Sequence, residues 1–209
     1  PWIMAVNRVE KTRQGRIEID VTYRSPVAVV ETFQGLVSVD AEGVVLPAGD
    51  IRPSDWERLP RLKGIRTIAS GLTGRKWNDP LVLSGAKLCS ALLPQGNIET
   101  LWKKYGLLAV VAPDRTRESA EEALQPPVFE LLTQKQRRII WGHPPDAESH
   151  EPSVAKKLER LAQYFKKQKS LDLPPGNLAV DIRRLSGIQL LPLSGATEPR
   201  QSRQETHLR

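Results

Sequence analysis

Residues 177–191, near the C-terminus, have the sequence NLAVDIRRLSGIQLL, and this stretch decides the fold. Its side chains alternate at a period of two: Leu178, Val180 and Ile182 share one face, and Ala179, Asp181 and Arg183 share the other. Strict alternation of this kind is typical of a half-buried β-strand. We therefore expect a strand with an apolar face on the core and Ala179, Asp181 and Arg183 facing outward.

The same stretch is interrupted once and then resumes. Ser186 and Gly187 break the alternation, which Ile188 and Leu190 continue, and this pattern predicts one strand with a bulge at the glycine. The strand ends at Pro192, and the polar segment 194–209 is expected to be disordered. A last strand without a successor is a candidate sheet edge, which can recruit a strand from another chain. An ordinary closing strand is the alternative.

Elements upstream of this stretch predict two main helices. The first begins at Asp79-Pro80, which suit an N-cap and a first turn, and ends at Pro94. The second begins at Pro152, and its apolar stripe consists of Val154, Leu158, Leu161, Ala162 and Phe165. Its charged residues lie mostly off that stripe and predict a solvated face: Lys156, Lys157, Glu159, Arg160, Lys166 and Lys167.

Shorter patterns predict the strands. An N-terminal hairpin is expected from strands at 2–9 and 16–23, and Arg24-Ser25-Pro26 then marks a boundary. A meander is expected over 27–46, a hairpin over 128–142, and further elements as follows: an irregular region at 48–62, a strand at 65–68, a short helix at 98–105, a strand at 107–111 and an exposed charged loop at 113–127. The fold class is thus α+β, an antiparallel-rich β-sheet packed with two main helices and preceded by a hairpin.

Composition indicates a globular chain with a basic surface. The 209 residues are 39% hydrophobic and 26% charged, with a net charge of +7. The basic residues are scattered and only 5% of residues are aromatic, so solvated basic faces are expected rather than nucleic-acid binding. A module that binds an anionic polymer remains the alternative. The single Cys89 lies on the apolar stripe of the first helix and is expected to be a buried structural thiol.

Signals for catalysis or metal binding are sparse. His143 and His150 share a loop with Asp146 and Glu148, but their spacing matches no metal-ligand motif. Asp114 and Glu118 form a possible carboxylate pair in a charged loop. The chain contains no phosphate-binding loop, dinucleotide fingerprint or nucleophile elbow. We expect no enzymatic activity, cofactor or metal, with an unrecognised extracytoplasmic hydrolase as the alternative.

The order of these segments resembles the FtsQ/DivIB cell-division family from the N-terminal hairpin to about Leu193. The segments that carry the resemblance are 24–28 (RSPVA), 37–47 (VSVDAEGVVLP), 59–64 (LPRLKG), 129–142 (FELLTQKQRRIIWG), 157–161 (KLERL) and 180–183 (VDIR). Residues 1–25 would then be the end of a POTRA domain, 26–193 the β-domain and 194–209 a tail. The region 103–127 is longer than is usual in the family, and Arg184 stands where an aromatic residue is common.

The resemblance implies a non-enzymatic divisome protein of the inner membrane. Its single-pass anchor and the rest of the POTRA domain would precede this sequence, and this domain would be periplasmic, at the division septum. The closing strand would pair with FtsB, held in a complex with FtsL. The implied partner-binding positions are Arg183, Arg184, Leu185, Ser186, Gly187 and Ile188. Arg183 would form a fork with a partner carboxylate, or else be a solvent-facing strand charge, and Gly187 would allow close backbone approach or end the pairing.

Overall fold

A computed structural model describes residues 1–69, 73–93, 99–116 and 118–193. The predicted tail at 194–209 lies outside the described residues. The strands are β1 (Ile3–Lys11), β2 (Ile17–Tyr23), β3 (Ala28–Thr32), β4 (Gly35–Val39), β5 (Arg61–Lys63), β6 (Leu107–Val111), β7 (Phe129–Thr133), β8 (Arg138–Gly142), β9 (Leu178–Asp181) and β10 (Gln189–Pro192). The helices are α1 (Pro53–Arg58), α2 (Pro80–Leu92), α3 (Glu99–Tyr105), α4 (Ala120–Leu124) and α5 (Val154–Gln168), with a 3-10 turn at Ala48–Asp50.

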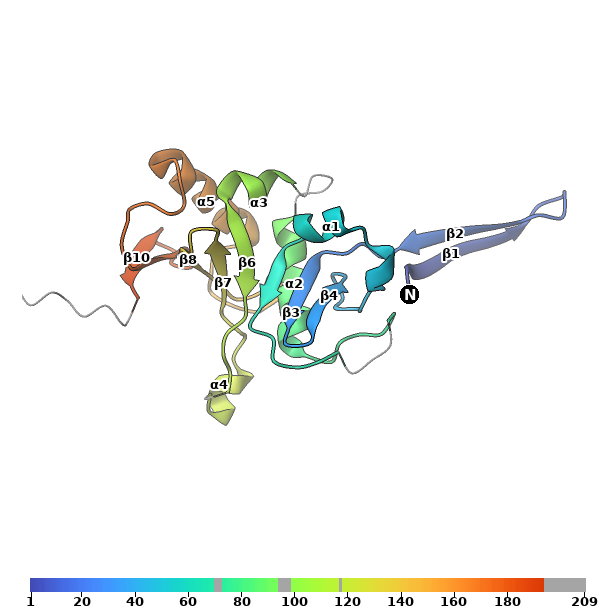
Figure 1. The fold of residues 1–209 in the computed structure, drawn as a ribbon, viewed down its shortest axis with the longest axis horizontal. Coiled ribbons are helices and arrows are strands. Elements are labelled where there is room, and N and C mark those ends of the chain that lie inside the picture. Colours follow the sequence, from blue (N-terminus) through green and yellow to red (C-terminus); the bar gives the residue numbers. More distant parts are fainter. Residues whose placement is uncertain (70–72, 94–98, 117, 194–209) are drawn as a thin grey trace, which may run out of the picture.

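Eight of these strands form one sheet, in the order β10-β9-β8-β7-β6-β5-β3-β4. The β10/β9, β8/β7, β7/β6 and β3/β4 pairs are antiparallel. The β9/β8, β6/β5 and β5/β3 pairs are parallel. Figure 1 shows the sheet running across the molecule, with β10 at one end and β3 and β4 toward the other. The predicted α+β class with an antiparallel-rich sheet is confirmed.

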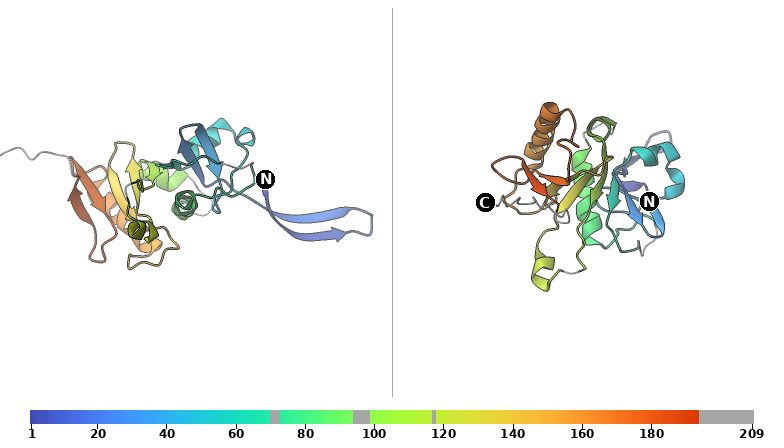
Figure 2. Two further views of the ribbon diagram at one scale, coloured as in Figure 1. Left: turned by 90° about the horizontal axis from the view of Figure 1, so that it is seen from below. Right: turned by 60° about the vertical axis from the view of Figure 1, so that its left-hand side comes forward.

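The hairpin β1–β2 is a separate two-stranded sheet that extends away from the main body, as the left view of Figure 2 shows. Its base is held by the indole of Trp2, which donates to Asp50 Oδ2 at 2.7 Å, and by Arg24, which pairs with the buried Asp40 at 2.5 Å. Along the hairpin, apolar side chains remain exposed: Ile3, Met4, Val6, Val9, Ile17, Ile19 and Tyr23. The hairpin therefore contributes little to the main core.

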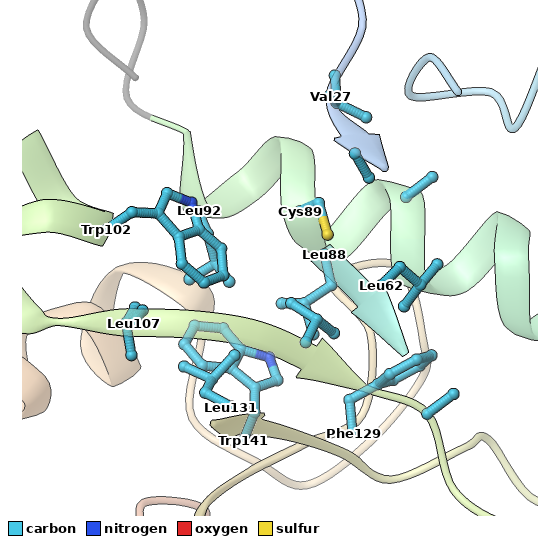
Figure 3. Close-up of a cluster of buried hydrophobic side chains, with 14 of the residues drawn as sticks. Val27, Leu62, Leu88, Cys89, Leu92, Trp102, Leu107, Phe129, Leu131 and Trp141 are labelled. Atoms are coloured by element: carbon cyan, nitrogen blue, oxygen red, sulfur yellow. The ribbon is translucent and has the colours of Figure 1, made fainter. Parts of the chain in front are cut away.

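The core lies between the sheet and the two long helices. Helix α2 packs against β3 and β5, and its Leu88 and Cys89 belong to the same buried cluster as Phe129 and Trp141 from the sheet (Figure 3). Gly85 allows this close packing, because a Cβ at that position would lie 2.6 Å from Leu62 Cδ1 on β5. Cys89 is completely buried, as expected, and burial raises the pKa of its thiol.

Most of the predicted elements are present. Asp79 caps α2 by accepting from the Leu81 amide, and Pro80 occupies its first turn. The strand expected at 65–68 is wrong: the strand is β5, a few residues earlier, within a region that was expected to be irregular and that also contains α1. Residues 44–46, the last part of the expected meander, are not a continuous strand. They form isolated bridges, from Val45 to Val39 and from Val44 to Lys76. Among the described residues, no helix is both long and apolar enough to cross a membrane.

Candidate functional site at the C-terminal sheet edge

The C-terminal stretch forms a hairpin and not the single bulged strand that was expected. Strand β9 ends at Asp181, residues 182–188 turn back, and β10 pairs with β9 in antiparallel register from Gln189 opposite Asp181 to Pro192 opposite Leu178. Gly187 has φ +131°, a conformation open to glycine and strained for other residues, and its amide donates to Arg184 O at 3.1 Å. A bulge and a turn interrupt the alternation in the same way, so the period alone did not distinguish them.

This hairpin places β9 inside the sheet, with β8 on one side and β10 on the other. Ala179, Val180, Asp181 and Ile182 are all at most 1% exposed. The expectation that Ala179 and Asp181 face outward is therefore wrong, because β9 is an interior strand that is buried on both faces. Figure 1 shows β10 in its place at the end of the sheet.

The open edge of the sheet is β10, because no described strand pairs with its outer side. The Leu193 amide donates to Asn177 O at 3.0 Å, so positions 193, 191 and 189 bond to the β9 side. Alternation in an antiparallel ladder then directs the amide and carbonyl of Leu190 outward. Pro192 is the next outward position and has no N–H, which limits the length of edge available to a further strand.

The six residues expected to bind a partner lie in the turn that leads into this edge. Arg184, Leu185 and Ser186 are exposed, with Leu185 at 75%, and Gly187 is half-buried. Ile188 is half-buried against the core. The structure brings all six together, but in the turn and not along the edge. The prediction placed the edge along the whole stretch and did not separate an interior β9 from the edge strand β10, although the Ser-Gly pair is also a turn signal that could have divided them.

Arg183 forms its carboxylate fork within the chain. Its Nε donates to Asp181 Oδ1 at 3.0 Å and its Nη2 to Asp181 Oδ2 at 2.8 Å, while its amide also donates to Oδ1 at 2.9 Å. Burial by itself would raise the pKa of Asp181, but the hydrogen bonds and charge of Arg183 outweigh it and lower that pKa. The hydrogen bonds to Asp181 likewise raise the pKa of Arg183. This guanidinium is already engaged, so neither expected role describes it.

Helix α5 holds the turn with a second arginine. Arg160 is only 7% exposed, and its Nη1 donates to the carbonyls of Ile182 at 2.8 Å and Arg184 at 2.5 Å. Its Nη2 donates to Leu185 O at 3.0 Å. Leaving a buried carbonyl unpaired costs about 1–3 kcal/mol, so a donor at this point is needed.

Two neighbours on the same face of α5 are polar as well. Lys157 is 3% exposed, pairs with Glu151 at 2.6 Å and lies over the ring of Trp141, at 5.1 Å from its centroid. The hydroxyl of Tyr164 donates to Leu173 O. Lys157 and Arg160 had been expected on the solvated face, and that expectation is wrong. Their positively charged ends bond to loops beside the sheet while the helix covers the core.

A groove of about 590 Å³ lies between α5 and the turn. Its helix wall includes Lys156, Gln163 and Lys167, and its other wall includes Leu185, Ile188 and Leu190. The groove therefore runs beside the open edge, with basic groups on one side and apolar groups on the other. This combination suits a strand with apolar and acidic side chains.

The opposite end of the sheet is less open. Residues 44–46 run along the outer side of β4, where the Leu46 amide donates to Ser38 O at 2.9 Å and Val45 bridges Val39. Backbone groups in the second half of β4 are therefore already paired. This leaves β10 as the better template for an added strand.

Four of the other candidate groups, His143, Asp146, Asp114 and Glu118, form ion pairs or loop contacts within the chain. His143 Nδ1 lies 3.3 Å from Pro127 O, and Asp146 pairs with Lys87. Asp114 pairs with Arg66 at 2.7 Å and Glu118 with Arg115 at 2.7 Å. Within the described ranges, no group of three or more His, Cys, Asp or Glu side chains is arranged to hold a metal ion.

No family model matches the chain, and no curated protein matches it.

Proposed function

We propose that this chain is a non-enzymatic division protein of the FtsQ/DivIB type, which binds FtsB, in complex with FtsL, by β-strand addition at β10. The observation that carries the proposal is the open edge of β10, where the amide and carbonyl of Leu190 point outward. Main-chain hydrogen bonds at such an edge supply affinity, and side chains of alternate positions supply selectivity. The segments that resemble this family, and their order along the chain, support the same assignment.

The proposal gives each part of the C-terminal hairpin a role. Strand β10 offers the backbone groups, and the groove beside it receives the partner's side chains. The exposed Leu185 and Arg184 lie where the added strand would end. The chain would act on the periplasmic side of the inner membrane at the septum, anchored by a segment that precedes this sequence.

The test replaces Leu190 by proline. Because the Leu190 amide points outward, the substitution removes a donor to the partner and leaves the bonds to β9 intact. Pro192 already occupies the equivalent position two residues later. We expect affinity for a labelled FtsB segment containing its docking strand to fall about tenfold or more, as expected for about 1.4 kcal/mol. Binding is measured by fluorescence anisotropy.

A matched control is Leu190→Thr, which changes the same side chain but keeps the amide. It should bind more tightly than Leu190→Pro, and both should melt close to the parent chain. Equal affinity of the two variants would argue against strand addition at this position. Wild-type protein that fails to bind FtsB in low and moderate salt would refute the proposed function.

A further inference from the structure

The backbone loses its sheet partners where the chain turns from β9 into β10. The ladder between the two strands ends at Asp181 and Gln189, so the carbonyls of Ile182, Arg184 and Leu185 lie beyond it. The turn contains one backbone hydrogen bond of its own, from the Gly187 amide to Arg184 O at 3.1 Å. A seven-residue connection with so few internal bonds does not define the path of the following strand by itself.

Arg160 supplies the missing bonds from outside the turn. One guanidinium bonds to all three carbonyls, at 2.8 Å, 2.5 Å and 3.0 Å, and Arg184 O accepts from both Arg160 and Gly187. The guanidinium is planar and presents several donors in a fixed arrangement, so it fixes the relative positions of the carbonyls it binds. A lysine ammonium at this position would act as a single point and would not impose that arrangement.

The helix around Arg160 is itself well anchored. Lys157 and Tyr164 lie on the same helix face, three residues before and four residues after Arg160, and bond to Glu151 and Leu173 O. Arg160 thus connects a fixed helix to the turn. Arg160 is also among the residues that border the groove beside β10.

We infer that Arg160 is a positioning residue for the docking edge: by holding residues 182–185 it sets the course of β10 and keeps its outer backbone groups available to an incoming strand. This role rests on the proposed function, since it acts on the edge that would bind FtsB. Arg160 is only 7% exposed and its guanidinium already bonds to three carbonyls of the turn, so its effect on the partner is indirect. It acts only through the turn.

The chain offers a matched control in Arg137, a second buried arginine that bonds to carbonyls. Its Nη1 donates to Gly176 O at 3.2 Å and to Leu178 O, and its Nη2 to Asp172 O at 2.6 Å and to Pro174 O. Arg137 therefore holds the connector before β9, whereas Arg160 holds the turn after it. Both side chains are 7% exposed, so their substitution removes comparable groups.

The experiment compares Arg160→Met, Arg160→Lys and Arg137→Met by hydrogen exchange of the whole chain and by binding of the labelled FtsB segment. In Arg160→Met, the acceleration of exchange in peptides covering 183–192 should be about tenfold or more greater than the acceleration in the rest of the sheet. Affinity should fall in parallel. Arg160→Lys should lie between the parent and Arg160→Met in both measurements, and it serves as the informative variant if Arg160→Met does not fold. Arg137→Met should instead accelerate exchange at 172–178.

Two results would overturn the inference. One is unchanged exchange at 183–192 in the Arg160 variants. The other is acceleration that is uniform over the whole sheet, which indicates a general structural role. If the parent chain does not bind FtsB, the proposed function fails, whereas exchange in the free protein still decides whether Arg160 holds the turn.

Discussion

Buried charges in the C-terminal half of this chain each have a specific partner. Asp181 is fully buried and bonds to Arg183, while Arg160 and Arg137 bond to main-chain carbonyls. Buried ionic groups are stable only when such partners offset their loss of hydration. Removing one of these groups therefore affects the whole segment to which its partner belongs.

Asp181→Asn tests how much the buried carboxylate of Asp181 contributes to stability. Since the pKa of Asp181 is lowered in the folded chain, its stabilising contribution is full above the unfolded pKa of about 3.9 and is lost as pH falls through the folded value. We expect the variant to lose about 2 kcal/mol of unfolding free energy at pH 7, the range of a charged hydrogen bond. The difference from the parent should shrink below pH 4. Urea unfolding at pH 7 and pH 3 measures both.

The control for that measurement is Asp20→Asn, which changes an exposed carboxylate on the β1–β2 hairpin. Its unfolding free energy should match that of the parent at both values of pH. A constant gap between Asp181→Asn and the parent across the acid range would show that the Asp181 charge has no part in the stability.

At the scale of elements, the C-terminal hairpin creates both the interior strand and the open edge. The turn at 182–188 places β10 beside β9, and Pro192 limits how far an added strand can extend. An open edge can also pair with the same edge of another copy of the chain. A short edge that ends in proline limits this edge-to-edge pairing. The turn is thus the element on which the proposed docking depends.

Gly187→Ala tests the turn. A Cβ at this position would meet no atom within 4 Å, so the cost comes from the backbone alone at φ +131°. We expect a loss of about 1–3 kcal/mol in unfolding free energy, the range for strained backbone conformations, with weaker FtsB binding. Ser186→Ala, at the neighbouring exposed position, should leave the unfolding free energy near that of the parent. Thermal and urea unfolding together with anisotropy measure these effects.

At the scale of the whole molecule, the main sheet and the β1–β2 hairpin differ in how much they bury. Ile19 on the hairpin is 58% exposed, whereas Leu88 in the core is completely buried. An isolated two-stranded hairpin is marginal in water, and most apolar side chains of this hairpin are exposed. The hairpin and the sheet should therefore respond differently to substitution.

The comparison of Ile19→Thr with Leu88→Ala tests this difference. Leu88→Ala should cost about 2–5 kcal/mol of unfolding free energy, because it leaves a cavity in the core. Ile19→Thr should change it by less than about 0.5 kcal/mol, as substitutions at exposed positions do. Urea unfolding followed by tryptophan fluorescence provides both values. A large effect of Ile19→Thr would show that the hairpin folds as part of the core.

The local elements followed from the sequence because their causes are local. Asp79 and Pro80 begin α2 through a cap and a fixed φ, and the alternation at 17–23 predicts β2, whose pairing partner β1 is the strand next to it in sequence. Strand β5 was misplaced because a three-residue strand between two parallel neighbours has too short a pattern to show a period.

The amino-acid sequence alone determined the two runs of alternating apolar side chains, one before Ser186 and one after Gly187, and the polar segment between these runs. Only the tertiary structure decided that this turn reverses the chain, that β9 becomes interior and β10 the edge, and that Lys157 and Arg160 are buried. The reason is physical: a charged residue on a helix is solvated or buried according to which carbonyls and carboxylates the rest of the fold brings to it. The open edge was thus correctly expected near the C-terminus, but its position and the arginine that holds it depend on contacts between segments far apart in sequence.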